Sequence, residues 1–151
     1  MATSTLIQFL DAGEGADTSN RRQVETFLAG GAIAAGDVVA LDIAGQTGTD
    51  SVLYVIQAGL VATGNPSAVG VSLDTVAAGQ QVRVVVSGYA ANVNCTNGTI
   101  AANAALSAGK TAAGEVETAA NTDTAGLFAV SLEAKGATTA NRVAIHILKR
   151  F

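Results

Sequence analysis

Ile33-Ala-Ala-Gly-Asp-Val-Val-Ala-Leu-Asp42 is the stretch that decides the fold, because a degenerate copy of it stands at Ile100-Ala-Ala-Asn-Ala-Ala-Leu-Ser-Ala-Gly109. A second correspondence follows in each half, between Val71-Ser-Leu-Asp74 and Val130-Ser-Leu-Glu133. We therefore interpret the chain as two degenerate β repeats, at about residues 33–89 and 100–148, in which Ala-Ala-Gly/Asn turns lead into strands. The repeats should share one strand order, with Val71 equivalent to Val130 and Leu73 equivalent to Leu132.

Six short runs rich in β-branched residues, bounded by Gly, Asn or Asp, predict strands. They are Val38-Val-Ala-Leu41, Val52-Leu-Tyr-Val-Ile56, Val69-Gly-Val-Ser-Leu73, Val82-Arg-Val-Val-Val86, Leu127-Phe-Ala-Val-Ser-Leu132 and Val143-Ala-Ile-His-Ile-Leu148. The Ala-rich residues 100–113 compete as a helix, but their glycines and the lack of an apolar stripe favour strand and turn. Since neither repeat would bury its apolar face alone, we expect an all-β fold with a single small barrel or sandwich built from both repeats.

The composition agrees with one small domain that has a thin core. The chain has 151 residues, 49% hydrophobic and 13% charged, so it should fold. Only 4% of its residues are aromatic, and a core of small side chains often gains stability from assembly. Residues 1–23 are polar apart from a short apolar patch and are interpreted as an extended N-terminal arm, which leaves residues 24–151 for the barrel or sandwich domain.

The charge distribution argues against nucleic acid as a partner. The net charge is −4, from 12 acidic and 8 basic residues, and no basic run is long enough to follow a phosphate backbone. Residues 135–151 do hold four cations and no carboxylate, so this end could meet an acidic surface or be a solvated strand tip. The first residues lack the pattern of a secretion signal, and no apolar run has membrane-spanning length. One cysteine, Cys95, fits a protein made in reducing cytoplasm.

The residues that could carry chemistry are each better explained as structure. Lys110 lies in Ala104-Ala-Leu-Ser-Ala-Gly-Lys110-Thr111, which resembles a phosphate loop but lacks the first glycine and a following helix pattern. His146 is the only histidine and lies inside a strand, and Cys95 has no cation near it in sequence. Glu115 and Glu117 share one face of an expected strand and indicate a solvated face. We therefore expect no enzyme activity, no catalytic residue, no metal and no cofactor.

One family resemblance rests on the order of three segments. Gly36-Asp-Val-Val-Ala-Leu41 is followed by Val69-Gly-Val-Ser-Leu73 and then by Ala78-Gly-Gln-Gln-Val-Arg-Val-Val-Val-Ser-Gly88. The second half repeats the theme at Ala108-Gly-Lys110 and Gly114-Glu-Val116. Over about residues 31–148 the chain resembles the head-decoration, or capsid cement, proteins of tailed bacteriophages. The arm is longer than that pattern suggests.

This resemblance implies a structural virion protein without an active site. Such a protein is made in the host cytoplasm, binds the major capsid protein on the outer surface of the head, commonly as a trimer, and stabilises the capsid. The alternative is a surface glycan-binding or adhesin-like β-domain of a phage or bacterium, and a host glycan could also be a partner. The residues expected to bind the capsid or a neighbouring subunit are apolar or basic and lie toward the two ends of the chain. They are Leu6, Ile7, Phe9, Leu10, Arg21, Arg22, Lys149 and Arg150.

Overall fold

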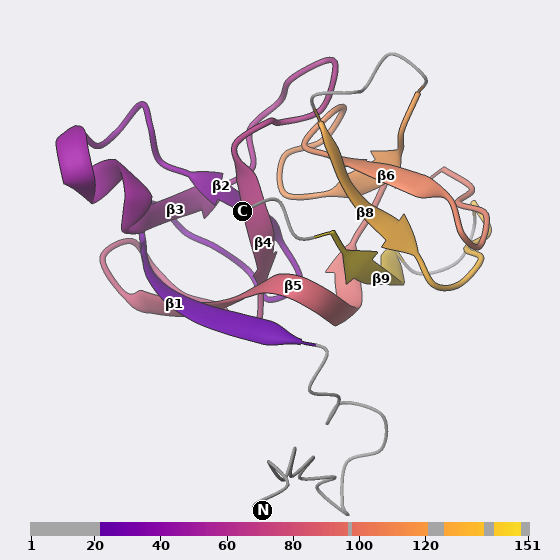
Figure 1. Cartoon of the computed structure of the whole chain (residues 1–151), viewed down its shortest axis with the longest axis horizontal. Helices are drawn as coiled ribbons and strands as arrows, with labels where there is room; N and C mark the ends of the chain where they lie inside the picture. The colour runs from indigo at the N-terminus through magenta and orange to yellow at the C-terminus, as the bar shows by residue number, and fades with distance from the viewer. Residues whose placement is uncertain (1–21, 97, 121–125, 138–140, 149–151) are drawn as a thin grey trace, which may run out of the picture.

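The computed structural model describes residues 22–96, 98–120, 126–137 and 141–148. Within these ranges the chain forms nine strands and one short 3-10 helix (Figure 1). The elements are β1 (Gln23–Ala29), β2 (Val38–Leu41), η1 (Gly48–Val52), β3 (Tyr54–Gln57), β4 (Ala68–Ser72), β5 (Gln81–Asn94), β6 (Ala105–Ala108), β7 (Val116–Thr118), β8 (Leu127–Ser131) and β9 (Arg142–Ile147). The predicted all-β fold class is confirmed: five strands, β1 to β5, close a small barrel, and the further strands lie beside it.

The six predicted strands are present as β2, β3, β4, β5, β8 and β9. β3 begins at Tyr54 rather than Val52, because Val52 is the last residue of η1. The Ala-rich residues 100–113 contain β6 and turns, as predicted, and no helix. The sequence does not predict β1, since residues 23–26 are exposed and show no apolar alternation. Gln23, assigned to the arm, is the first residue of β1, and residues 1–21 lie outside the described residues.

The two repeats pair their strands in the same register. In the first repeat β2 pairs with β4, and in the second β6 pairs with β8, each with one irregularity after the second residue pair. The pairs are Val38↔Val71, Val39↔Gly70 and Ala40↔Ala68 in the first repeat, and Ala105↔Val130, Leu106↔Ala129 and Ser107↔Leu127 in the second. Val71 and Val130 are therefore equivalent, as predicted. Leu73 and Leu132 are equivalent too, because each amide donates a 2.9 Å hydrogen bond to a carbonyl of the closing strand.

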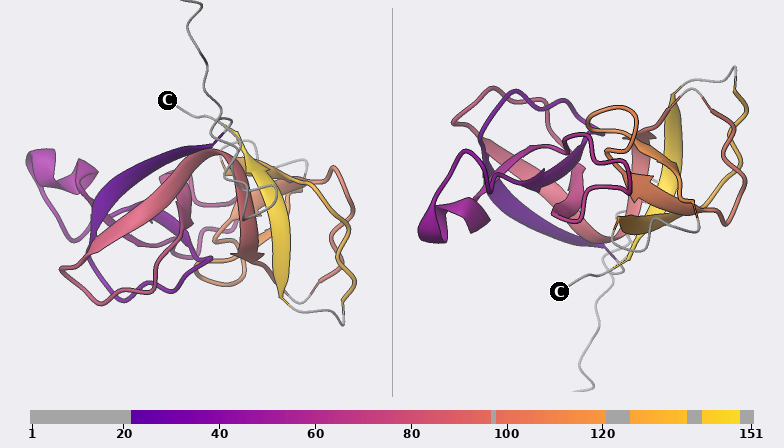
Figure 2. Two further views of the ribbon diagram at one scale, coloured as in Figure 1. Left: turned by 90° about the horizontal axis from the view of Figure 1, so that it is seen from below. Right: turned by 90° about the horizontal axis from the view of Figure 1, so that it is seen from above.

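The barrel is closed by β1 to β5, and the strands of the second repeat pair with one another in the same way as those of the first. β1 completes the order β1-β3-β2-β4-β5 by pairing with β5 as well as with β3. In the second repeat the later part of β5 stands where β1 stands in the first: it pairs with β9 and forms the parallel bridge Cys95↔Val116 beside β7. That bridge matches Ala29↔Val55 between β1 and β3. β5, 14 residues long, thus belongs to both halves and runs from one to the other (Figures 1 and 2).

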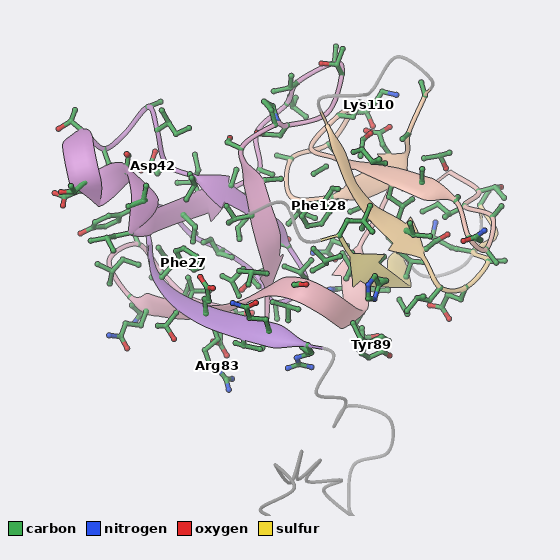
Figure 3. The ribbon with its side chains drawn as sticks, viewed as in Figure 1. Phe27, Asp42, Arg83, Tyr89, Lys110 and Phe128 are labelled. Carbon is green, nitrogen blue, oxygen red and sulfur yellow. The ribbon has the colours of Figure 1, made fainter. Side chains whose placement is uncertain are left out.

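The core has two clusters, and one of them joins the repeats. Alternate residues of β5, such as Val82 and Val84, lie in the cluster inside the first barrel. Val85, the residue that follows Val84, belongs to the larger cluster, which also contains Phe128 and Ile145 of the second repeat. Phe27 and Phe128 accordingly mark two separate regions of packing (Figure 3). The first repeat thus cannot bury its apolar surface alone, as predicted, since its outward valines are covered by the second.

Equivalent turns lead into β2 and β6. Gly36 has φ 89° and Asn103 has φ 61°, which places both in the left-handed region that glycine and asparagine tolerate best. The amide of Gly36 donates to the Ser72 carbonyl at 2.8 Å, and the amide of Asn103 donates to the Ser131 carbonyl at 2.9 Å. The predicted Ala-Ala-Gly/Asn turns are confirmed, and each turn leads directly into a strand of the sheet.

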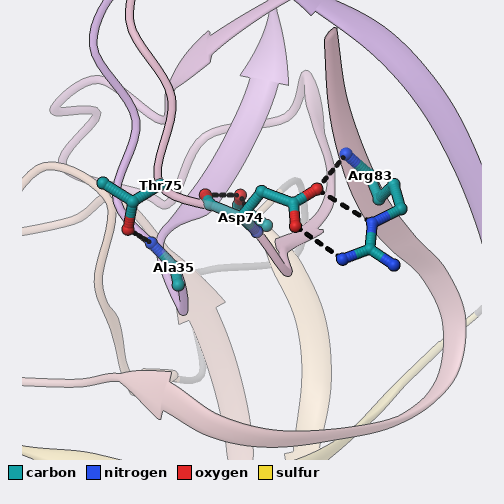
Figure 4. Close-up of polar contacts among 5 residues, drawn as sticks. Ala35, Asp74, Thr75 and Arg83 are labelled. Carbon is teal, nitrogen blue, oxygen red and sulfur yellow. Dashed lines mark hydrogen bonds and ion pairs between the residues drawn. The ribbon is translucent and has the colours of Figure 1, made fainter.

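The acid after each Val-Ser-Leu motif holds the next strand. Asp74 Oδ2 accepts a 3.0 Å hydrogen bond from the Arg83 amide, and Glu133 Oε1 accepts one of 2.8 Å from the Ala144 amide. In the first repeat the Arg83 side chain adds a two-pronged ion pair, with Nε 3.0 Å from Oδ2 and Nη2 2.7 Å from Oδ1 (Figure 4). Because this guanidinium bonds the carboxylate, the pKa of Asp74 is lowered.

Candidate partner-binding surfaces

The first strand starts, and the last strand ends, beside the middle of β5. Gln23, the first residue of β1, pairs with Ser87, and Ile147, the last residue of β9, pairs with Gly88. β1 and β9 therefore meet on neighbouring residues of β5. Sequence reasoning treats the basic residues of the two ends separately. The pairing shows that the segments before β1 and after β9 both leave the fold next to the middle of β5. No sequence signal marks this convergence, because it depends on the length and sharing of β5.

Of the eight residues expected to bind a partner, the structure describes Arg22. The remainder lie outside the described residues, namely Leu6, Ile7, Phe9, Leu10, Arg21, Lys149 and Arg150. Arg22 is half-buried and lines a groove of about 460 Å³ between the repeats. We call this the junction groove, and its described lining is Arg22, Ala35, Gly36, Ser72, Leu73, Ala91, Asn92 and Arg142. The described lining holds two arginines and no carboxylate.

Arg142 crosses the junction groove and joins the two repeats. Its Nη1 donates to the Ala35 carbonyl at 3.0 Å and to the Asn92 carbonyl at 2.7 Å. Gly36 makes room for it: a Cβ there would overlap Arg142 Nη1 and would lie 2.5 Å from the Asn92 oxygen. Both bonds use Nη1, so Nε and Nη2 keep donors that can bind an acceptor in the groove.

A buried polar cluster near the groove fixes the relative position of the repeats. Asp37 is 4% exposed, and its Oδ1 accepts a 2.6 Å hydrogen bond from Asn94 Nδ2 at the end of β5. Its Oδ2 accepts from the Ala34 amide at 2.8 Å and from Gln57 Nε2 at 3.1 Å. A buried carboxylate with three donors is stable, and removal of the carboxylate would leave those donors without an acceptor. These hydrogen bonds connect the turn before β2 with β3 and with the end of β5, next to the groove.

A second surface is apolar and consists of exposed residues on the β2–η1 and β3–β4 loops and at the start of β8. Leu60 is 63% exposed, Ile43 is 62% exposed, and Val61 and Leu127 are at least one-third exposed. The loop of Leu60 and Val61 meets the start of β8, since Gly64 and Gly126 are so close that a Cβ on either would overlap the other backbone. A shallow pocket of about 340 Å³, lined by Leu41, Ile43, Pro66 and Ser67, adjoins this region. Sequence reasoning missed this apolar loop surface, because isolated apolar residues in loops carry no periodic signal.

The residues considered for chemistry occupy structural positions. Lys110 lies between β6 and β7, so the loop ends in a strand and not in the helix that a phosphate loop requires (Figure 3). His146 is exposed on β9. Cys95 is fully buried, and desolvation raises the pKa of its thiol despite the nearby charges of Lys135 and Arg142. Glu117 Oε1 accepts a 2.6 Å hydrogen bond from the Thr111 amide, which holds the β6–β7 connection.

One of the four cations in residues 135–151 is buried. Lys135 is only 4% exposed, and its Nζ donates to the carbonyls of Thr96 at 2.9 Å and Gly98 at 3.2 Å. Its equivalent in the first repeat is Val76, since Ile33↔Val76 and Ile100↔Lys135 are matching bridges. The lysine stem thus fills an interior position, and its ammonium group holds a loop instead of meeting a partner.

Two general searches gave negative results over the described ranges. No group of three or more His, Cys, Asp or Glu side chains there could hold a metal ion. Likewise, none of the helical segments in that part of the chain is long and apolar enough to cross a membrane.

A solved structure of a phage head protein has a similar fold. The chain matches the head fiber gp8.5 N base of bacteriophage phi29 with a TM-score of 0.55 and 17% sequence identity. The match covers 84% of this chain and 94% of that one, so it includes both repeats. No protein-family model and no curated protein sequence matches the chain. At this identity the likeness establishes the fold, and it agrees with the bacteriophage-head resemblance found in the sequence.

Proposed function

We propose that this protein is a structural component of a bacteriophage virion that binds the outer surface of the head and reinforces the capsid. The observation that carries the proposal is the fold, which is shared along nearly the whole length of a phage head fiber base. Two independent features support it: the segment order resembles head-decoration proteins, and the exposed groups gather into a basic groove and an apolar loop surface. A rigid two-repeat β scaffold with such surfaces suits binding better than catalysis.

In this proposal the N-terminal arm provides attachment. Leu6, Ile7, Phe9 and Leu10 form an apolar patch in a segment too polar to build its own core, and such a patch is unfavourable in water without a partner. Because the chain enters the fold beside the junction groove, the arm starts from a fixed point on the surface. The major capsid protein is the proposed partner, and a trimer on the head is the proposed arrangement.

The test is addition of the purified protein to expanded heads that lack it. We expect saturable, stoichiometric binding, measured by densitometry of purified heads, and a higher temperature of capsid disruption. Deletion of residues 1–21 leaves β1 intact, so urea unfolding should change by no more than about 1 kcal/mol, while occupancy is largely lost. A truncated protein that unfolds far more easily, or that still fills the heads, would show that the arm belongs to the fold and not to the attachment.

A matched variant tests the apolar loop surface. Leu60→Ser combined with Leu127→Ser removes two exposed apolar side chains and should leave the free protein folded. If this surface contacts the capsid, occupancy falls while the urea midpoint stays the same. Normal occupancy assigns the attachment to the arm alone. Sedimentation of the free and released protein tests the proposed trimer.

A further inference from the structure

We propose that the junction groove binds residues 11–20 of the same chain through their carboxylates. The groove contributes Arg22 and Arg142, and the segment contributes Asp11, Glu14 and Asp17 without any basic residue. The net charge of the protein is −4, whereas the charged groups in the described lining of the groove are all positive. The groove thus has the opposite sign of charge to the whole chain. Opposite charge thus selects this segment among the parts of the chain that can reach the groove.

The donors of Arg142 fit a carboxylate. Its guanidinium is exposed, and its hydrogen bonds to the Ala35 and Asn92 carbonyls hold it by Nη1 alone. No carboxylate among the described residues pairs with it, in contrast to Arg83, whose Nε and Nη2 both bond Asp74. Nε and Nη2 are the atoms that form a two-pronged contact with a carboxylate. Arg142 is therefore already oriented and keeps the donors that such a contact uses.

The connection favours binding within one chain. Arg22 lines the groove itself, and Asp17 is five positions before it, an extended span of about 17 Å at most. A short flexible linker gives an effective concentration in the millimolar range, far above that of a second copy in dilute solution. With residues 11–20 held in the groove, the apolar patch at residues 6–10 would be presented at a defined place. The inference concerns the free protein, so it stands or falls independently of capsid binding.

The first test is hydrogen exchange of the amides of residues 11–20 in the full-length protein. We expect exchange about fivefold slower at low salt than at high salt, because the contacts are between exposed charges. Replacement of Asp11, Glu14 and Asp17 by Lys should remove that difference without altering exchange in β5. Because this variant changes no described residue, it cannot fail by damage to the fold described above. Salt-independent exchange in the unaltered chain would overturn the proposal.

The second test is a double-mutant cycle on the same exchange rates. Arg142→Gln removes the charge and should accelerate exchange in residues 11–20, with no further increase when it is combined with the three Lys substitutions. Arg83→Gln is the matched control, since Arg83 is exposed but does not line the groove, and it should leave these rates unchanged. Equal effects of the two Arg variants would contradict the inference. Protection that appears only at high protein concentration, with a dimer in sedimentation, would assign the segment to a second copy and would also overturn it.

Discussion

The two repeats make the same backbone hydrogen bonds with different side chains. In the first repeat the turn before β2 is held by Asp37, whose Oδ2 accepts from the Ala34 amide. In the second repeat the position of Asp37 is occupied by Ala104, and the equivalent turn is held by Ser131, whose Oγ donates to the Ala101 carbonyl at 2.6 Å and accepts from the Ala104 amide at 2.8 Å. The fold thus depends on turn geometry and on the size of apolar residues, and each repeat satisfies its polar groups in its own way.

The difference has a positional cause. Asp37 also reaches forward to Asn94, which belongs to the strand shared with the second repeat. The described structure has no third repeat beyond the second, so an acid at position 104 would have no equivalent strand end to bind. Asymmetry between the repeats is therefore concentrated where one repeat contacts the next. Substitutions at equivalent positions of the two repeats test whether this asymmetry contributes to stability.

The largest expected difference is between Gly36→Ala and Asn103→Gly. Both positions have positive φ, but only a Cβ at position 36 would overlap Arg142 and approach the Asn92 carbonyl. We expect Gly36→Ala to lower the free energy of unfolding by about 3 kcal/mol or more. Asn103→Gly should change it by less than about 1 kcal/mol, since glycine adopts this conformation readily. Urea unfolding followed by circular dichroism measures both, and similar losses would mean that the groove around Gly36 is not tightly packed.

The next effect is expected at Asp37. Asp37→Ala leaves the donors of Asn94, Gln57 and Ala34 without their acceptor, so we expect a loss of about 2–3 kcal/mol. The loss should be partly relieved in Asp37→Ala combined with Asn94→Leu, which removes one of the stranded donors. Thermal unfolding by calorimetry gives the values. An additive double variant would show that the two side chains act independently and that the cluster does not couple the repeats.

A smaller contrast separates the two buried serines. Ser131→Ala removes an acceptor and a donor that hold the turn before β6, and a loss of about 1–2 kcal/mol is expected. The Ser72 hydroxyl instead bonds the backbone of Asp74 within its own turn, at 2.7 Å to the carbonyl. Ser72→Ala should therefore cost less than Ser131→Ala, about 1 kcal/mol or below. The reverse order in chemical unfolding would contradict the division of roles between Asp37 and Ser131.

The smallest effect is the pH dependence of the Asp74–Arg83 pair. The pKa of Asp74 in the folded protein lies below its ordinary value of 3.8, chiefly because of the hydrogen bond from Arg83. A lowered pKa adds stability above the unfolded value, and that stability is lost as pH falls through the folded pKa. Arg83→Gln should thus lower the melting temperature slightly at neutral pH, with a gap from the unaltered protein that closes below about pH 4. A gap that persists in acid would assign the effect to packing of the Arg83 stem.

The sequence predicts the repeats better than it predicts their surfaces. Val-Ser-Leu-acid and Ile-Ala-Ala are readable because Ile33 and Ile100 form matching bridges and Val71 and Val130 pair at matching positions in the two halves. β1 escapes prediction because the side chains of residues 23–26 are exposed although the strand pairs with β5, so polar residues are tolerated there and no apolar alternation marks the strand. The junction groove cannot be read from the sequence, since Arg22, Leu73, Asn92 and Arg142 are brought together only by the shared strand.

β5 also determines how the protein would respond to mechanical load. Because β1 starts beside Ser87 and β9 ends beside Gly88, a pull on either end of the chain acts at adjacent points of one strand. Tension between the two ends would peel β1 and β9 away from β5 in opposite directions, one pair of hydrogen bonds at a time, instead of shearing many pairs at once. Load applied across the face of the molecule is instead carried by the continuous covalent backbone of β5 from one half to the other. Both ends of the described fold are therefore held by the strand that also spans its two halves.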